Sequence, residues 1–201
     1  VGKQRHDKNN AAPALDLLTA TAGLVRDTDK MIYSILVSPI TFRHPSVLVK
    51  MASTINNMAP CRFRLGVGTG WLEIEHELFG IPFPDLKTRF EMLEEYLIYI
   101  RQALSGNNQG FKGEYYQLDK FPVEPAKLSE IPIIIGGGGK VKTPTLAGKC
   151  SEEFNIYAGP KETLQNSINL FKTVASENGR DEKTLEITTA CPPVVGITKE
   201  S

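Results

Sequence analysis

Cysteine and long apolar runs are both scarce in this 201-residue sequence, and each scarcity excludes a class of protein. The three cysteines, Cys61, Cys150 and Cys191, lie far apart, and none belongs to a C-x-x-C or Cys/His ligand pair. This spacing excludes a disulfide-stapled secreted fold and a zinc site, and it favours a reducing, cytoplasmic setting. No apolar run approaches the roughly 20 residues of a membrane span, so we expect no membrane partner.

An excess of charge of one sign is also lacking. The formal net charge is +0, from 23 basic and 23 acidic residues, so no overall field attracts nucleic acid. Hydrophobic residues make up 41% of the chain and charged residues 23%, as in ordinary globular domains. Any anion-binding site must therefore be local. We expect a small-molecule substrate and no nucleic acid, with a homodimer left open.

What the sequence does contain is an alternation of apolar strands and amphipathic helices. The run Met31–Val37 is almost continuously apolar, as in a strand covered on both faces. The capping-box spacing of Thr88 and Glu91 predicts the start of a helix that Gly106 ends. The predicted strands are Met31–Val37, Arg62–Gly68, Pro132–Ile135, Glu153–Tyr157 and Leu185–Ala190. The predicted helices begin at Pro13, Pro45, Thr88, Pro144 and Pro160.

This order of elements predicts an α/β fold whose parallel sheet is joined by right-handed crossovers. The pattern alone leaves two architectures open, a (β/α) barrel and a doubly wound open sheet. Both place ligands beyond the carboxyl ends of the strands. The stretch 107–130 interrupts the alternation with polar and aromatic residues. We expect a small hairpin around Gly113 in this excursion, on a binding face.

Four consecutive glycines, Gly136 to Gly139, follow the third predicted strand and precede a helix start at Thr143-Pro144. Bare backbone N–H groups beside a helix N-terminus can bind phosphate, and Lys140 and Lys142 add positive charge. The alternative is a tight turn that needs positive φ. The run is no Walker loop, because Val141 follows Lys140 in place of Ser or Thr, and it lacks the last glycine of a dinucleotide turn.

A second glycine-rich stretch, GVGTGWLEIEHELFG, begins at Gly66. Its glycines alternate at a strand end, where a flat aromatic ligand can lie against the backbone near Gly68 with Thr69 as a hydrogen-bonding group; close helix–sheet packing is the alternative. Trp71 is expected in the core. Surface pairing and helix capping are favoured over catalysis for the charged residues that follow. These residues are Glu73, Glu75, Glu77 and Arg89.

Two histidines are candidate catalytic groups. Ser38-Pro39 ends the first predicted strand, and a cis bond there would press the chain against a ligand, although trans is favoured. His44 lies just before a helix, where it either donates a proton near neutral pH or caps that helix, and capping is favoured. His6, followed by Asp7, precedes the first predicted helix at what would be the end of a strand.

Together these stretches resemble the luciferase-like superfamily of flavin- and deazaflavin-dependent oxidoreductases, in particular its coenzyme F420-dependent branch. The resemblance implies a TIM-type (β/α)8 barrel that holds FMN or coenzyme F420 at the carboxyl ends of its strands. It runs in family order through FRHPSVLVKMASTINNM, RFRLGVGTGWLEIEHELFGIPFPDLKTRFEMLEEYL, FKGEYYQLDKFPVEPAK, PIIIGGGGKVKT and EEFNIYAGP.

By position, the resemblance implies cofactor contacts at three places. The family's glycine-rich loop matches Gly136, Gly137, Gly138 and Gly139 with Lys142 and Thr143. Gly68 and Thr69 match the strand end beside the ring, and Ser38 matches a strand end where members often carry a cis peptide. Two departures stand out. Cys61 replaces the usual glycine, and RHDKN, which contains His6, stands where the family has an Asp-His or similar pair.

Barrels of this kind take about 250 residues and eight βα units, of which about five are predicted here. We therefore expect residues 1–201 to form one partial barrel domain of a longer chain. The implied activity is hydride transfer or monooxygenation of a small organic substrate. Two alternatives are a non-catalytic flavin-binding scaffold and, less favoured, a nicotinamide-dependent dehydrogenase. The substrate, the choice between F420 and FMN, and the catalytic acid or base stay open.

Overall fold

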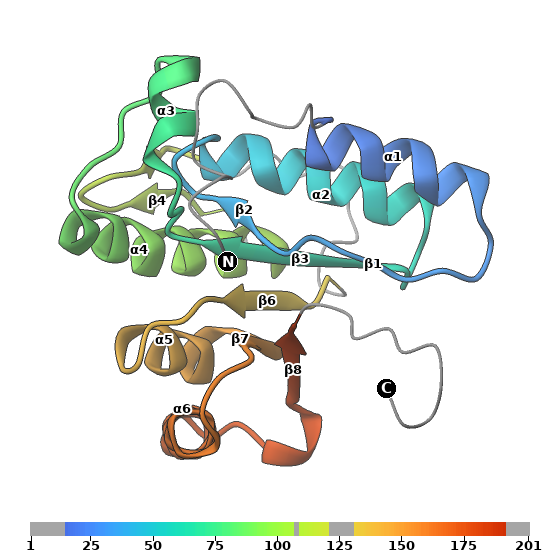
Figure 1. Cartoon of the computed structure of the whole chain (residues 1–201). Helices are drawn as coiled ribbons and strands as arrows, with labels where there is room; N and C mark the ends of the chain where they lie inside the picture. The colour runs from blue at the N-terminus through green and yellow to red at the C-terminus, as the bar shows by residue number, and fades with distance from the viewer. Residues whose placement is uncertain (1–14, 107–108, 121–130, 192–201) are drawn as a thin grey trace. The chain divides into compact units, whose positions relative to one another are not determined.

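The computed structural model describes residues 15–106, 109–120 and 131–191, in two compact units, Val1–Ile134 and Ile135–Ser201 (Figure 1). Strand β6 (Ile133–Gly136) begins in the first unit and ends in the second. The first unit also contains α1 (Leu17–Asp27), β1 (Tyr33–Ser34), β2 (Ser38–Pro39), α2 (Pro45–Met58), β3 (Phe63–Gly68), α3 (Glu73–Phe79), α4 (Leu86–Leu104), β4 (Phe111–Lys112) and β5 (Gln117–Leu118). The second unit continues with α5 (Lys142–Cys150), β7 (Glu153–Tyr157), α6 (Lys161–Glu177), the 3-10 helix η2 (Glu182–Thr184) and β8 (Glu186–Ala190).

Strand β3 organises the first unit, because β1 and β2 both pair with it in parallel. The register places Tyr33 opposite Phe63 and Ser38 opposite Val67. Helices α1 and α2 lie side by side (Figure 1). The predicted strand at Arg62–Gly68 and the predicted helix from Pro45 are confirmed, the helix with proline in its first turn as its fixed φ favours. The main buried residues of this unit are Phe63, Leu65, Val67, Leu48, Ala52, Ile55, Leu93, Leu97 and Ile100.

The prediction of one continuous strand at Met31–Val37 is wrong. Two short strands, β1 and β2, replace it, and the Leu36–Val37 peptide between them is cis, whereas no cis bond is found at Ser38-Pro39. Within the run only Ile35 is fully buried, while Leu36 is 51% exposed. Continuous apolar sequence indicates burial on both faces only where both faces are covered, and the described part of the chain covers this run incompletely.

Two predicted helix starts are also wrong, for the same physical reason. Helix α1 begins at Leu17 and not at Pro13, because the Asp16 side chain caps it by accepting a hydrogen bond from the Thr19 N–H at 2.9 Å. Helix α4 begins at Leu86 and not at Thr88, because Asp85 accepts from the Thr88 N–H at 2.9 Å. In both helices an Asp side chain supplies the cap. The predicted end of α4 is confirmed, with Gly106 at φ +74° after Ser105.

The predicted hairpin around Gly113 is confirmed by the antiparallel pairing of β4 and β5. Its turn is fastened to α4 by the carboxylate of Glu95, which accepts three backbone hydrogen bonds. Glu114 donates its N–H to Oε2 at 2.8 Å, and Tyr115 and Tyr116 donate to Oε1 at 3.0 and 2.6 Å. Hydrogen bonds to a charged acceptor are stronger than neutral ones, so Glu95 is the main tie between hairpin and helix.

We expect Glu95→Ala to release this hairpin. Three backbone donors lose their acceptor, and the free energy of unfolding should fall by about 1–3 kcal/mol. Glu95→Gln, which keeps one amide oxygen as an acceptor, should lie between Ala and the wild type. Denaturant unfolding gives the free energy, and amide hydrogen exchange locates the change. If hydrogen exchange at the 114–116 amides is unaltered in Glu95→Ala, the Glu95 carboxylate does not hold the hairpin against α4.

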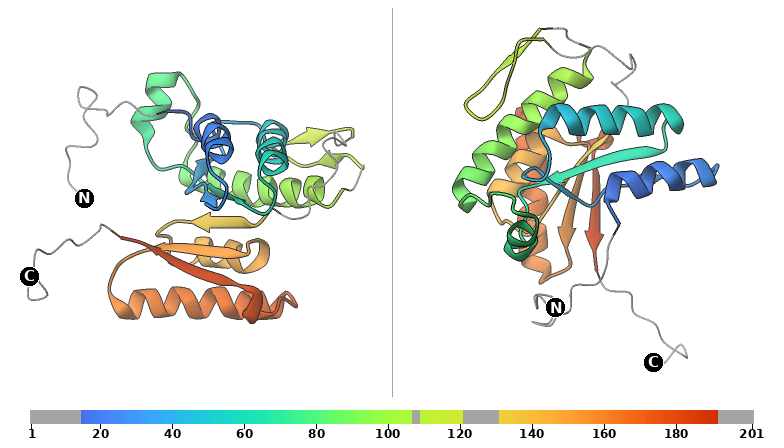
Figure 2. Two further views of the ribbon diagram at one scale, coloured as in Figure 1. Left: turned by 90° about the vertical axis from the view of Figure 1, so that its right-hand side faces the viewer. Right: turned by 90° about the horizontal axis from the view of Figure 1, so that it is seen from above.

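The second unit is built on β7 and β8, which run parallel to each other (Figure 2). Their register places Asn155 opposite Thr188. The predicted strand Glu153–Tyr157 is confirmed with the same bounds, and the helix predicted from Pro160 is α6, for which Pro160 is the N-cap. Helices α5 and α6 pack closely where Gly148 lies, since a Cβ there would come within 2.7 Å of the Phe171 carbonyl oxygen. The helix predicted from Pro144 starts two residues earlier, at Lys142.

Candidate functional site

In the first unit, the ends of β2 and β3 lie together. The parallel register sets Ser38 opposite Val67 and Pro39 opposite Gly68, so Ser38, Gly68 and Thr69 meet at one edge, as the sequence predicts for the carboxyl ends of neighbouring strands. The Ser38 side chain is 1% exposed, and its Oγ has no hydrogen-bond partner among the described residues. A buried hydroxyl without a partner costs about 1–3 kcal/mol. A polar ligand atom at this strand end would satisfy it.

Gly66 and Gly70, near the end of β3, are required to be glycine for different physical reasons. A Cβ on Gly66 would overlap the carbonyl oxygen of Ile35 on the neighbouring chain segment, so close backbone packing requires glycine there. Gly70 has φ +78°, a conformation that other residues rarely adopt. The reason for Gly66 is therefore close packing against a neighbouring strand segment and not the helix–sheet packing considered from the sequence, while Thr69 stays a candidate ligand contact.

The turn after β3 is held by Arg89 of α4. The side chain is buried, and its Nη1 donates to the carbonyl oxygen of Gly70 at 2.6 Å and to that of Thr69 at 3.4 Å. Its Nε donates to the Pro84 carbonyl at 2.9 Å, and its guanidinium carbon lies 3.7 Å from the centre of the Phe83 ring. Burial lowers the pKa of Arg89, and the charges of Asp85 and Glu73 oppose that shift.

Sequence reasoning missed His76, which is buried on α3 at 1% exposure. Its Nδ1 lies 2.9 Å from the Leu72 carbonyl oxygen, and its Nε2 lies 2.7 Å from Thr41 Oγ1, in the turn after β2. The ring packs on Phe83 at 4.3 Å between centroids. The sequence did not predict α3 as a helix. The signal that was available is Gly80, which ends it in a left-handed conformation at φ +64°.

Two other expectations for this stretch are wrong. Trp71 is 69% exposed and does not belong to the core of the described residues. Arg89 contacts backbone carbonyls and an aromatic ring, so pairing with the glutamates at 73, 75 and 77 does not explain its position. A buried guanidinium is instead satisfied by carbonyl oxygens, which match its fixed fork of donors.

His44 is the N-cap of α2, which is the favoured alternative from the sequence. Its Nδ1 accepts from the Ser46 N–H at 3.3 Å, and its ring lies edge-on to Tyr99 and Tyr116. Burial lowers the pKa of His44. Tyr116 is 6% exposed and packs on Tyr96, so its ring helps to pack the hairpin against α4. The other candidate histidine, His6, and the RHDKN stretch lie outside the described residues.

In the second unit, Gly136 ends β6, and Gly137, Gly138 and Gly139 lie in the loop that leads to α5. Gly137 has φ +150°, and its N–H donates to the Asn155 carbonyl at 3.2 Å, so the loop is tied to the neighbouring strand. A Cβ on Gly139 would crowd the Thr143 side chain. Gly138 differs from both. It is exposed, it has no positive φ, and a Cβ there would meet only Tyr157, at an ordinary 3.5 Å.

Helix α5 begins directly after this loop. Its N-cap, Val141, makes no side-chain capping hydrogen bond, so no side chain at that position competes for the first N–H groups of the helix. Lys140 and Lys142 are exposed beside the loop, and Thr143 is 5% exposed in the first turn. Bare backbone, a helix N-terminus and local positive charge are the features that bind a phosphate. The residues present therefore fit a phosphorylated cofactor.

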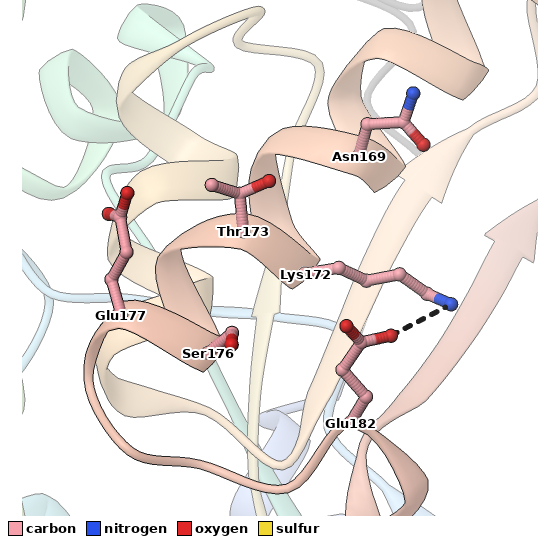
Figure 3. Close-up of a pocket in the computed structure, with 6 residues that line it drawn as sticks. All are labelled: Asn169, Lys172, Thr173, Ser176, Glu177 and Glu182. Carbon is pink, nitrogen blue, oxygen red and sulfur yellow. Dashed lines mark ion pairs between the residues drawn. The ribbon is translucent and has the colours of Figure 1, made fainter.

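An open, polar pocket lies at the opposite end of the second unit, on α6 and η2 (Figure 3). Lys172 and Glu182 form an ion pair across it at 3.4 Å. The pocket borders η2, which precedes β8, whereas ligand sites of parallel α/β folds lie beyond the carboxyl ends of strands. None of the predicted site residues lines it, and we assign it no function. Its lining residues are Asn169, Lys172, Thr173, Ser176, Glu177 and Glu182.

Metal ligands and membrane-spanning helices were sought across residues 15–106, 109–120 and 131–191. In these ranges no group of three or more His, Cys, Asp or Glu side chains is arranged to hold a metal ion. Over the same ranges, no helix combines the length and the apolar character that crossing a membrane requires. Cys61, Cys150 and Cys191 are all thiols and form no disulfide.

Comparison with solved structures defines the fold. An F420-dependent secondary alcohol dehydrogenase superposes with a TM-score of 0.81 at 24% identity, over 90% of this chain and 55% of that one. The coenzyme F420-dependent tetrahydromethanopterin reductase of Methanopyrus kandleri gives a TM-score of 0.71 at 18% identity, over 87% and 54%. The predicted architecture, part of a TIM-type barrel, is confirmed by this likeness.

Sequence comparison then gives the family. The luciferase-like monooxygenase family matches residues 3–201, and the chain belongs to that family. It is 34% identical to an F420-dependent glucose-6-phosphate dehydrogenase of Nakamurella multipartita over 80% of this chain and 46% of that protein. It is 33% identical to the pyrimidine monooxygenase RutA of Serratia proteamaculans over 81% and 50%. The chain spans about half the length of the curated relatives it matches.

Proposed function

We propose that the chain forms the cofactor-binding part of an oxidoreductase that uses coenzyme F420 or FMN to act on a small organic molecule. The observation that carries the proposal is Gly138. Backbone conformation explains the glycine at 137 and a neighbouring side chain explains the one at 139, but neither explains the exposed one at 138. A ligand that must touch the backbone does explain it, since any side chain would stand in its way.

Each unit, taken by itself, carries a set of candidate contacts. In the second unit, the N–H groups at Gly138, Gly139 and the start of α5 would bind a phosphate, with Lys142 and Thr143 at its side. In the first unit, Ser38 Oγ would bond to a polar atom of the ring system, and the backbone at Gly68 and Thr69 would lie against its flat face. The partnerless, buried Ser38 hydroxyl supports the second of these assignments.

The bound cofactor supplies two-electron hydride transfer, or oxygen transfer when a reduced flavin meets oxygen. The relatives include both an F420-dependent dehydrogenase and a monooxygenase, so both chemistries belong in the proposal. This chain's residues bind and orient the ring. His44 is the candidate proton-transfer group among the described residues. Burial lowers the pKa of His44, and its Nδ1 accepts the Ser46 N–H, so the neutral ring would present its Nε2–H to a ligand.

The setting and partners belong to the proposal as well. We place the enzyme in a reducing, cytoplasmic environment, because three thiols without a disulfide fit that compartment. The formal net charge of +0 supports a small-molecule substrate and no nucleic-acid partner.

Titration of the full chain with coenzyme F420 and, separately, with FMN tests the proposal. We expect one of the two to bind with a dissociation constant in or below the micromolar range. Quenching of the cofactor's fluorescence measures the binding. Turnover of the bound cofactor with candidate donors or oxygen then separates an enzyme from a scaffold that only binds. If neither cofactor binds at 100 μM, the proposal is wrong.

A further inference from the structure

We propose that Arg89 is a positioning residue for the cofactor ring, because it fixes which way the backbone faces in the turn after β3. This inference rests on the proposed function above. It concerns Thr69, Gly70 and Trp71, the residues that follow the last residue of the strand, Gly68.

The orientation follows from peptide geometry. The Thr69 and Gly70 carbonyl oxygens both accept hydrogen bonds from Nη1 of Arg89. In a planar trans peptide the C=O and the following N–H point in opposite directions. The N–H of Gly70 therefore points away from the guanidinium. This donor faces the opposite side of the turn, where a carbonyl or imine acceptor of the ring would be bound.

The guanidinium is itself held in place on three sides. Its Nε donates to the Pro84 carbonyl at 2.9 Å, and its guanidinium carbon lies over the Phe83 ring, 3.7 Å from the centroid. His76 also packs on Phe83, with 4.3 Å between the ring centroids. Its Nε2 lies 2.7 Å from Thr41 Oγ1. A planar cation that stacks and donates in a fork loses little freedom on binding, so it sets the carbonyl direction more firmly than a lysine could.

Gly70 links this cluster to the β2 turn. It has φ +78°, and a Cβ there would lie 3.4 Å from Pro39 and 3.5 Å from Thr41 Oγ1. The turns after β2 and β3 therefore approach each other at Gly70, next to the Ser38 strand end. Arg89 and His76 hold these two turns from the helix side. An arrangement of this kind preorganises a ligand-binding edge, so that the ligand does not have to order it.

The test compares Arg89→Met with Arg89→Lys and with Lys87→Met, which removes an exposed cation from the same helix as a matched control. The probes are the cofactor that the wild type binds, FMN or coenzyme F420, and its phosphate-free form. We expect Arg89→Met to weaken both probes by the same factor, at least tenfold, because the turn contacts the ring and not the phosphate. Arg89→Lys should fall between Met and wild type, and Lys87→Met should match wild type.

Amide hydrogen exchange is measured on the same proteins, and Arg89→Met should raise it at residues 69–72. If the wild type binds and Arg89→Met binds within twofold of it, the positioning role is wrong and the proposed function stands. If the wild type binds neither cofactor, the proposed function fails and this inference fails with it. Should Arg89→Met not fold, Arg89→Lys decides: wild-type affinity for both probes would overturn the inference.

Discussion

Gly66→Ala is expected to destabilise the first unit more than any other single methyl addition considered for this chain. The added Cβ would overlap the backbone carbonyl of Ile35, and backbone cannot rotate away as a side chain can. Overpacking of this kind typically costs about 1–3 kcal/mol and more where backbone must move, so we expect a loss of at least about 3 kcal/mol. Denaturant unfolding, followed by circular dichroism, measures it.

Gly23→Ala is the matched control for this substitution. Gly23 lies in α1, and a Cβ there would meet nothing within 4 Å. Alanine in a helix interior is favoured over glycine by about 1 kcal/mol, so this variant should be stabilised. If Gly66→Ala unfolds at the same denaturant concentration as the wild type, the backbones of β3 and the preceding segment are farther apart than the structure has them.

Gly138→Asp is expected to have the largest effect on cofactor binding. The position is exposed, and a side chain there meets only Tyr157, so the fold should tolerate it. A carboxylate beside a bound phosphate is repelled, and like charges brought together cost several kcal/mol. We expect affinity for the phosphorylated cofactor to fall by about 100-fold, which corresponds to about 2.7 kcal/mol. Fluorescence titration measures the dissociation constant.

Two comparisons make the result specific. Gly138→Asn has the same size without the charge, and it should lose clearly less affinity than Gly138→Asp. The affinities of Gly138→Asp and Gly138→Asn should differ less for the phosphate-free form of the cofactor than for the phosphorylated form. The melting temperatures of the two variants should match within about 2 °C, because a surface substitution seldom changes stability by more than about 0.5 kcal/mol. Equal losses for the phosphorylated and phosphate-free forms would place the phosphate elsewhere.

The parts of the fold that could be predicted are those with a local cause. Proline at the start of α2 and of α6, a run of alternating apolar residues in β3, and the Gly106 end of α4 all act within a few residues of the backbone they shape. The helix starts were wrong where two local signals competed. Asp85 and Thr88 can both cap a helix, and spacing alone does not say which one does.

The parts that could not be predicted depend on contacts across the chain. Arg89 reaches Gly70, 19 residues earlier, and His76 reaches Thr41, 35 residues earlier. The spacing of apolar residues along the sequence does not predict contacts between residues so far apart. The same holds for Gly66, whose need for glycine comes from Ile35 and not from its own turn. By contrast, the glycine loop and the strand ends were visible as candidates, because bare backbone at the end of a buried strand is unusual in itself.

The most direct test of the account is to follow the backbone amide resonances of Gly137, Gly138 and Gly139 while coenzyme F420 or FMN is added. The account predicts that these three resonances shift in proportion to occupancy, and that they shift far less with the phosphate-free form at the same occupancy. A cofactor that binds tightly while these resonances stay in place would contradict it, because the phosphate would then be held by some other part of the molecule.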